Sequence, residues 1–233
     1  HTIEHSLREA AGGAAHLVER AVREQIGILK GMAASLAFDR WDLETVRKEA
    51  ERLWDLHPEW RTVIVTDEHR PLFNLHFPPG EPITPLRDPE SLAHVWATGR
   101  AIAGNLAHGY VAIRVPVERS GRLVYTIVAP ISPQYFSDQL QAHVQDQSWK
   151  AAIVGSDGIV IAATPGSLMP VGKPLPWDIP ISAEGYRVDG SDYKAWASVA
   201  ESGWQVVIVA PAAAVEQPYA RTRMAVYIGG AFA

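Results

Sequence analysis

The sequence of 233 residues contains no cysteine and no apolar stretch long enough to cross a bilayer. The lack of cysteine excludes a disulfide framework, a thiolate zinc site and a cysteine nucleophile, and a membrane helix needs about 20 consecutive apolar residues. Basic residues are also few, since 21 Lys and Arg stand against 26 Asp and Glu, for a formal net charge of −5. Such a chain has no basic surplus to neutralise a run of phosphates, so we expect no nucleic-acid partner.

The composition is that of an ordinary globular protein, with 47% hydrophobic and 20% charged residues. A chain of this length can form one large domain or two small ones, and it can bury about 70% of its unfolded surface. We predict two small units, because the sequence contains an internal repeat.

The repeat consists of two signals in the same order. The stretch Trp60–Asp67 resembles Trp149–Asp157, since each has an aromatic residue, a basic residue, an apolar run and an acidic turn. The string Ile-Val-Ala-Pro then occurs at Ile127–Pro130 and again at Ile208–Pro211, each time after a Ser-Gly pair. A Ser-Gly hairpin that feeds an apolar strand ended by proline is thus expected to close each of two tandem copies.

We expect a helix before the copies and five strands in each. Residues 1–36 are predicted to form one long helix, because apolar residues recur at steps of three and four. The first copy, 37–134, is expected to have a helix near 91–98 and strands near 62–66, 71–77, 101–106, 111–118 and 123–130. The second copy with its connecting helix, 135–218, is expected to have strands near 151–156, 159–164, 185–188, 193–200 and 204–211. The proline-rich stretch 165–180 is expected to be an extended loop.

The first helix is long for the units that follow it. At 1.5 Å per residue it would extend about 54 Å, which exceeds the width of a small domain. We therefore expect part of it to run past the core that it covers and to pack against a second copy of the chain. A second helical pattern begins after Asp42 and ends at His57, before Pro58.

Together these features resemble the double Cache (PAS-like) extracytoplasmic sensor domains of bacterial receptors. The more specific parts are Asn74 followed by Pro79-Gly80, the strand Ile113–Val117, Tyr125 on the next strand, and Asp157-Gly158 in the second copy. The resemblance implies an α+β fold: a long N-terminal helix followed by two tandem PAS-like units, each a five-stranded antiparallel sheet flanked by helices. The sequence departs from the amino-acid-binding branch, because the Tyr, Arg, Trp, Tyr and Asp pattern expected after Gly99 is missing.

The resemblance also implies a function and a location. The chain is expected to be the periplasmic part of an inner-membrane receptor, most simply a sensor histidine kinase, with a cyclase or a chemoreceptor as alternatives. The membrane-distal unit would bind a small molecule, the second unit would be a spacer without ligand, and the long helix would form a homodimer. Residues 219–233 would lead into a truncated membrane helix, although their last ten residues could also be a helix packed on the core. A non-sensing dimerisation module remains a second interpretation.

No catalytic, metal or cofactor site is expected. His1 and His5 with Glu4 between them match a zincin spacing, but a fraying terminus cannot hold a ligand set. The segment Gly155–Gly158 lacks the spacing of a nucleophile elbow, and no phosphate-cradling glycine loop precedes a helix.

The expected ligand site lies on the strands of the first copy. Arg114 stands between Ile113 and Val115, and a guanidinium in a half-buried strand needs an anionic or carbonyl partner. That partner is either an anionic ligand, such as an organic acid, or a carboxylate of the chain such as Glu118 or Asp67. The candidate ligand-binding residues are Asn74, His76, Trp96, Asn105, His108, Tyr110, Arg114 and Tyr125.

The strand register decides whether Arg114 and Tyr125 act together. Pairing Val117 with Leu123 across a five-residue loop would place Arg114 opposite Thr126. Tyr125, opposite Val115, would then lie on the other face of the sheet. A slip of one residue reverses this assignment, so the register stays open.

Overall fold

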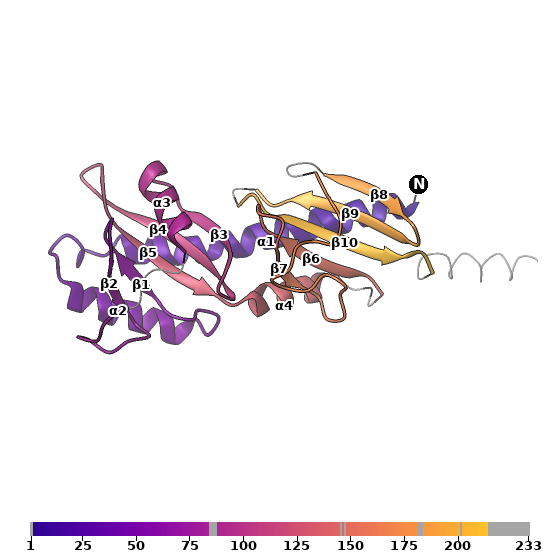
Figure 1. Cartoon of the computed structure of the whole chain (residues 1–233). Coiled ribbons are helices and arrows are strands. Elements are labelled where there is room, and N and C mark those ends of the chain that lie inside the picture. Colours follow the sequence, from indigo (N-terminus) through magenta and orange to yellow (C-terminus); the bar gives the residue numbers. More distant parts are fainter. Residues whose placement is uncertain are drawn as a thin grey trace, which may run out of the picture.

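The computed structural model describes residues 2–83, 88–144, 146, 148–180, 184–200 and 202–213. A 32-residue helix, α1 (Thr2–Ala33), lies along two five-stranded antiparallel sheets that follow each other along its length (Figure 1). The predicted α+β class, with a long N-terminal helix and two sheets flanked by helices, is confirmed. No helix within these residues has the length and apolar character of a membrane span, and the segment 219–233 lies outside them.

The first unit contains two helices and one sheet. The helices are α2 (Leu43–Leu56) and α3 (Pro89–Thr98), and the strands are β1 (Ile64–Thr66), β2 (Pro71–Asn74), β3 (Ile102–Ala107), β4 (Tyr110–Arg119) and β5 (Arg122–Ile131). Helix α2 begins at Asp42, whose side chain accepts a hydrogen bond from the Thr45 amide. Helix α3 ends at Gly99, where φ is 64°. The strand order is β2-β1-β5-β4-β3.

The second unit repeats this arrangement. Helix α4 (Pro133–His143) leads into β6 (Lys150–Val154), β7 (Val160–Ala163), β8 (Gly185–Asp189), β9 (Asp192–Ser198) and β10 (Gln205–Pro211). The order β7-β6-β10-β9-β8 corresponds strand by strand to that of the first sheet. The stretch 165–180 contains no helix and no extended strand, as its prolines predicted.

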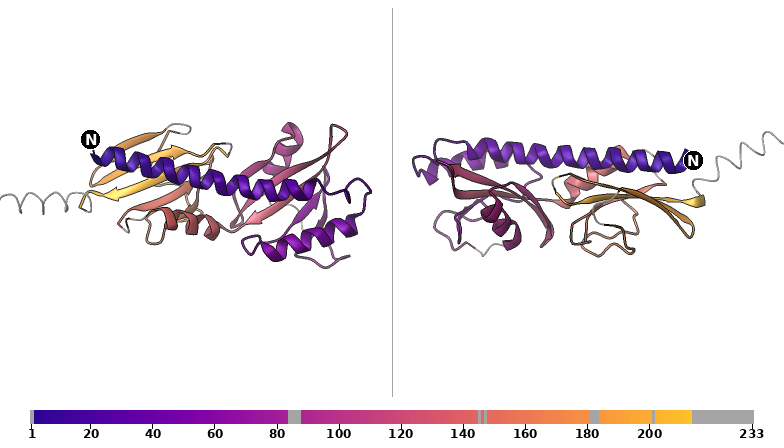
Figure 2. Two further views of the ribbon diagram at one scale, coloured as in Figure 1. Left: turned by 180° about the vertical axis from the view of Figure 1, so that it is seen from behind. Right: turned by 90° about the horizontal axis from the view of Figure 1, so that it is seen from above.

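Helix α1 is long because it packs on the second sheet as well as the first, and not because it extends past a core. The helix contacts β4 and β5 of the first sheet and β8, β9 and β10 of the second, and it lies on the same side of both sheets (Figure 2). Its buried side chains, among them Leu7, Val18 and Leu29, belong to one core cluster with the inner faces of both sheets. The predicted run past the core is therefore wrong, because the core that α1 covers extends over both sheets.

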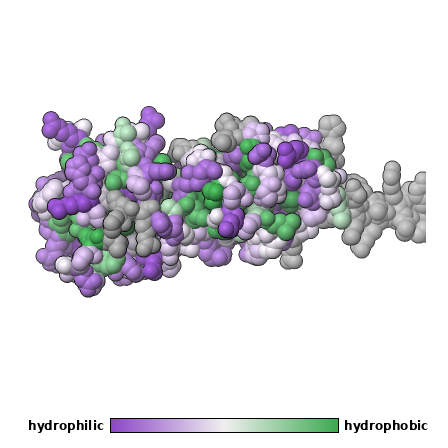
Figure 3. All heavy atoms as spheres, viewed as in Figure 1, coloured by the Kyte–Doolittle hydropathy of each residue, from purple (hydrophilic) through white to green (hydrophobic). Residues whose placement is uncertain are grey.

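The outer faces of the two sheets point away from α1. Figure 3 shows this side of the molecule, where small hydrophobic patches lie between hydrophilic residues. On the outer face of the second sheet, Ala152, Val160 and Val207 form a separate cluster with Met169, Leu175 and Trp177 of the proline-rich loop. The loop thus covers this face with its own side chains.

The hairpin between β4 and β5 corrects the predicted register. Arg119 pairs with Arg122, and Ser120 and Gly121 form a two-residue turn with φ of 51° and 73°. Because the turn is shorter than the expected loop and a bulge follows Val117, the register moves by two residues. Arg114 therefore lies opposite Val128, not Thr126.

Candidate functional site

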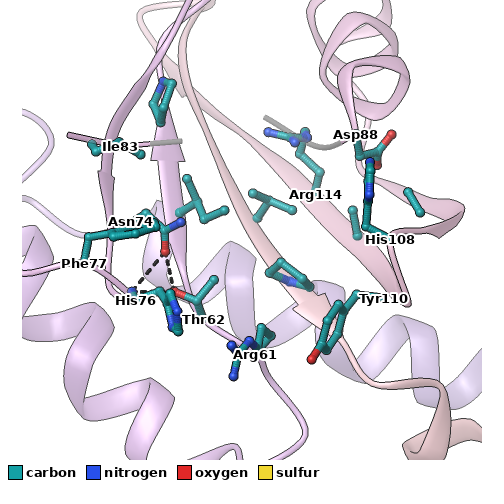
Figure 4. A pocket seen from close by; sticks show the side chains of 16 residues that line it. Arg61, Thr62, Asn74, His76, Phe77, Ile83, Asp88, His108, Tyr110 and Arg114 are labelled. Atoms are coloured by element: carbon teal, nitrogen blue, oxygen red, sulfur yellow. Dashed lines mark hydrogen bonds between the residues drawn. The ribbon is translucent and has the colours of Figure 1, made fainter. Parts of the chain in front are cut away.

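A cavity of about 160 Å³ opens on the outer face of the first sheet (Figure 4). Strands β1 to β5, the segment after β2, the β3–β4 turn and the start of α3 all contribute to it. Its apolar wall includes Ile64, Val128 and Pro130. Its polar lining consists of Arg61, Thr62, Asn74, His76, Asp88, His108, Tyr110 and Arg114.

Arg114 is the most deeply buried charge at this cavity. Only 1% of it is exposed, and its guanidinium donates to the hydroxyls of Ser91 at 2.9 Å and Thr126 at 3.0 Å. Burial lowers its pKa to about 10, although the nearby charge of Asp88 acts in the opposite direction. Both hydrogen-bond partners are neutral, so they orient the guanidinium without balancing its charge.

The predicted chain carboxylates do not pair with Arg114. Asp67 instead caps its own turn by accepting from the amides of His69 and Arg70 at 2.8 Å. Glu118 lies beyond the bulge near the end of β4, by Gly99. Among the described residues Arg114 forms no ion pair, so the alternative of a salt bridge to Glu118 or Asp67 is wrong.

Asp88 is the carboxylate among the described lining residues. One oxygen caps α3 by accepting from the Ser91 amide at 3.2 Å. The other oxygen is buried without a hydrogen-bond partner in the described part of the chain. It lies beside Gly104, where a β-carbon would come within 2.9 Å of it. The lack of a side chain at Gly104 is what allows Asp88 to approach the strand.

The opposite wall of the cavity is held by a small polar network. The Thr62 hydroxyl donates to Oδ1 of Asn74 at 2.7 Å, and the His76 amide lies 3.0 Å from both oxygens (Figure 4). These bonds occupy the amide oxygen of Asn74. They fix the start of the segment after β2, which carries His76 and Phe77 to the cavity.

The turn between β3 and β4 supplies two further candidates. His108 adopts a φ of 50° and Gly109 a φ of 83°, so the turn is tight. His108 and Tyr110 both line the cavity, and Figure 4 shows them on the side opposite Asn74 and His76. The structure therefore brings together Asn74, His76, His108, Tyr110 and Arg114.

Tyr125 was expected at the ligand site but lies on the inner face of the sheet. It pairs with Val117, and its ring packs 5.7 Å from Phe38 and 4.9 Å from Trp41, measured between centroids. It is 1% exposed, and burial raises its pKa. The cause is the parity of the strands, which puts Arg114 and Tyr125 on opposite faces.

Trp96 and Asn105 also lie outside the cavity lining. Trp96 is half-buried on α3 and is not among the lining residues. Asn105 faces the second unit, where its amide oxygen accepts from the Ser156 amide at 3.0 Å. Its role is thus to join the two units, which the sequence of one unit could not reveal.

Several residues of the site were missed by the sequence analysis, including polar ones. Arg61, Thr62 and Asp88 line the cavity, and Ser91 holds Arg114 from α3. Only Arg61 had a usable signal, because it is the basic residue that follows the repeated tryptophan. Asp88 and Ser91 come close to Arg114 only through the packing of α3 on the sheet.

Solved structures with the same fold are ligand-binding and extracellular domains of receptors. The ligand-binding domain of the Pseudomonas aeruginosa chemoreceptor PctC, in complex with GABA, has a TM-score of 0.69 and 19% identity, and the match covers 89% of this chain and 99% of that one. The extracellular domain of the candidate histidine kinase mmHK1S-Z3 has a TM-score of 0.72 and 13% identity, over 94% and 97% of the chains. The CtaA chemoreceptor domain of Pseudomonas fluorescens, in complex with L-isoleucine, has a TM-score of 0.67 and 17% identity, over 90% and 92%.

These similarities establish the fold that the chain shares with double Cache-type domains. No protein-family model and no curated protein matches the sequence. Within the described residues, no group of three His, Asp or Glu side chains is arranged to hold a metal ion. The cavity lined by Arg114 is the candidate ligand site of the described residues.

Proposed function

We propose that the chain is the extracytoplasmic ligand-sensing domain of a membrane-bound receptor and that its first unit binds a small organic anion. The observation that carries this proposal is Arg114, a buried guanidinium at a cavity with no ion-pair partner among the described residues. An anionic ligand would balance this charge and accept its remaining hydrogen bonds. The shared fold supports the proposal, since PctC and CtaA are ligand-binding domains.

The positions of the chain ends support a membrane-distal first unit. The start of α1 and the end of β10 lie at the same end of the molecule, beside the second sheet (Figure 1). If both ends lead to membrane anchors, the second unit is proximal and the cavity faces away from the membrane. The predicted role of the second unit as a spacer agrees with its covered outer face.

A polar cluster connects the cavity to α1. Arg61 and Thr62 line the cavity, and the preceding Trp60 donates through its ring nitrogen to Gln25 of α1 at 2.5 Å. Gln25 is 2% exposed and also donates to Glu59 at 3.0 Å. We infer that ligand binding moves α1 through this cluster, which requires that the ligand bind one arrangement of the helix better than the other.

The receptor is proposed to act as a homodimer through α1. The inner side of the helix is covered by both sheets, whereas His16, Arg20, Gly27 and Gly31 on its outer side are exposed. Sedimentation velocity of the chain should detect a dimer whose population rises with concentration and with ligand. A monomer at all concentrations, with or without ligand, would contradict this part of the proposal.

For the output we propose a histidine kinase, supported by the fold shared with mmHK1S-Z3. The alternative outputs are a chemotaxis region or a cyclase. The full-length receptor in vesicles should change its autophosphorylation rate when the ligand is added. Methylation-dependent signalling without autophosphorylation would favour the chemoreceptor instead.

The sensing role is tested by a thermal-shift screen against organic acids, amines and sugars. Binding to the native state raises the melting temperature by mass action, and we expect organic anions to do so. The shift should disappear in Arg114→Met and persist in the control Lys194→Met. A non-sensing dimerisation module, the second interpretation, would show no shift with any class of compound.

A further inference from the structure

The two sheets carry a buried cation at the same position. Arg114 on β4 pairs with Val128 of β5, and Lys194 on β9 pairs with Val209 of β10. Val128 and Val209 are the second residues of the two Ile-Val-Ala-Pro strings, so Arg114 and Lys194 correspond in the duplication. Both side chains are buried, with 1% and 5% of the residue exposed.

In the second unit the chain itself supplies the partners of this cation. The ammonium of Lys194 lies 4.1 Å from the ring centroid of Trp177 and 2.8 Å from a carboxylate oxygen of Asp189. Trp177 comes from the proline-rich loop that covers the outer face of the second sheet. The cation is therefore stabilised by an aromatic face and by a carboxylate at once.

In the first unit the described residues supply no aromatic face, and the nearby carboxylate of Asp88 acts on the charge of Arg114 without forming an ion pair with it. Within the described part of the chain, Arg114 has only the hydroxyls of Ser91 and Thr126 as hydrogen-bond partners, and no aromatic ring lies over its guanidinium. Asp189 corresponds along the sheet to Gly104, because Ile102 pairs with Arg114 as Arg187 pairs with Lys194. The strand thus has no carboxylate of its own at this position, and the unpartnered oxygen of Asp88 lies beside Gly104 instead.

The volume of the first-unit cavity suits one aromatic ring. Its volume is about 160 Å³, and a protein cavity of about 150 Å³ is known to accept one benzene ring. Ile64, Val128 and Pro130 provide an apolar wall for such a ring, and the charge of Arg114 lies at its edge (Figure 4).

We propose that the ligand of the first unit is an aromatic carboxylate with a single ring, whose carboxylate gives Arg114 the ion pair that Lys194 has with Asp189 and whose ring fills the space that Trp177 fills in the second unit. This inference rests on the proposed sensing function and names the class of its ligand. The carboxylate binds Arg114, and the ring lies against the apolar wall. The second unit has no corresponding ligand because its loop fills the same place.

The test is calorimetric titration of the whole chain with a matched series. Benzoate has both features, benzamide lacks the charge, cyclohexanecarboxylate lacks the aromatic ring, and succinate lacks any ring. We expect benzoate to bind at least about tenfold more tightly than benzamide, the value of one charge-assisted hydrogen bond. It should also bind more tightly than cyclohexanecarboxylate, because a flat ring suits a cavity of this volume better than a puckered ring does.

Two variants assign the binding to the first unit. Arg114→Met should weaken benzoate binding at least about tenfold, whereas Lys194→Met at the corresponding position should leave it unchanged. Binding of succinate but not benzoate, with dependence on Arg114, would overturn the aromatic class and leave the sensing function standing. Failure of every anion to bind would overturn both.

A third variant tests the comparison between the units without relying on Arg114. Trp177→Ala removes the ring over Lys194 but leaves Asp189 in place. A neutral aromatic molecule should then bind in the space that the Trp177 ring has left. We expect indole to raise the melting temperature of Trp177→Ala and not that of the wild type. A variant that folds but does not respond to indole would contradict the view that Trp177 occupies a ligand-like position.

Discussion

At the scale of single residues, Arg114 and Lys194 offer a stability comparison in the absence of ligand. Burying a charge that has no ion-pair partner is unfavourable, so Arg114→Met should leave the free energy of unfolding unchanged or raise it. The hydroxyls that it releases keep other contacts, since Ser91 lies 3.4 Å from the Asp88 carbonyl and Thr126 lies 2.7 Å from Thr66. Urea unfolding measures the effect.

The matched control is Lys194→Met, which should behave differently. It removes the cation from the face of Trp177, a contact worth about 1 kcal/mol. We therefore expect Lys194→Met to destabilise the chain and Arg114→Met not to. A loss of more than about 2 kcal/mol in Arg114→Met would show that the guanidinium is a structural group, in line with the usual effect of breaking a buried network.

Glu59 gives a prediction about pH. Burial raises its pKa, but hydrogen bonds from its own backbone, His57 and Gln25 outweigh this effect and hold the pKa below the ordinary value of 4.5. Its contribution to stability is thus fully present above about pH 4.5 and is lost as the pH falls through the lower pKa of the folded state.

Glu59→Gln should therefore destabilise the chain at pH 7 by about 0.5–1 kcal/mol, a value reduced by the solvent exposure of the carboxylate. The difference from wild type should shrink as the pH falls below about 4, because the carboxylate is then protonated in both states. Unfolding at several pH values measures it. A difference that stays constant down to the lowest pH would contradict the account.

The candidate residues show what a sequence can reveal at this scale. Arg114 stood out because a charge within an apolar strand needs a partner, and this argument needs no tertiary information. Tyr125 was misplaced because aromatic character says nothing about which face of a strand a residue occupies. Asp88 and Ser91 were missed because their contact with the site depends on how α3 packs.

At the scale of elements, α1 determines how the two units unfold. Leu7 packs near its start and Leu29 near its end, and both are fully buried in the core cluster that spans the two sheets. Because this one helix packs on both sheets and joins them in one core cluster, we expect a single unfolding transition rather than two.

Leu7→Ala and Leu29→Ala test this by their effect on the whole chain. Each should lower the free energy of unfolding by about 2–5 kcal/mol. Tryptophan fluorescence and circular dichroism should still give coincident transitions in both variants. Two separate transitions, with only one of them moved by each substitution, would mean that the units unfold independently.

The contact between the units offers a second prediction for elements. A β-carbon at Gly155 would lie 2.7 Å from Oδ1 of Asn105 and 2.6 Å from Oδ1 of Asp157. Gly155→Ala should therefore displace Asn105 and free the Ser156 amide, which it holds at 3.0 Å. Hydrogen exchange of this amide should accelerate.

Gly27→Ala is the matched control for that substitution. It lies on α1 with open space around the new methyl group, so the exchange of the Ser156 amide should not change. Equal exchange rates in wild type and Gly155→Ala would show that Asn105 does not connect the units.

The elements also show why the fold was predictable and the register was not. The repeated Ile-Val-Ala-Pro strings and the Ser-Gly pairs are local signals, so they indicated two sheets correctly. The pairing of β4 with β5 depends on a two-residue turn and a bulge, which shift the register without changing the apolar pattern. A long helix at the N-terminus was predicted correctly. The reason for its length, which is that it also packs on the second sheet, was not.

At the scale of the whole molecule, the two repeated sheets have the same strand order but different outer faces. Both keep a buried cation at the same register position, yet one adjoins a cavity and the other is covered by its own loop. The inner faces share α1 and form one core. In the proposed function, the first unit responds to a ligand and the second transmits the change along the common helix.

The most direct test is a crystal structure determined with the anion that raises the melting temperature most. We expect one anion in the first-unit cavity, with its acidic group within about 3 Å of the Arg114 guanidinium, and Trp177 still over Lys194 in the second unit. An anion bound elsewhere, with Arg114 paired to a carboxylate of the chain, would contradict the account.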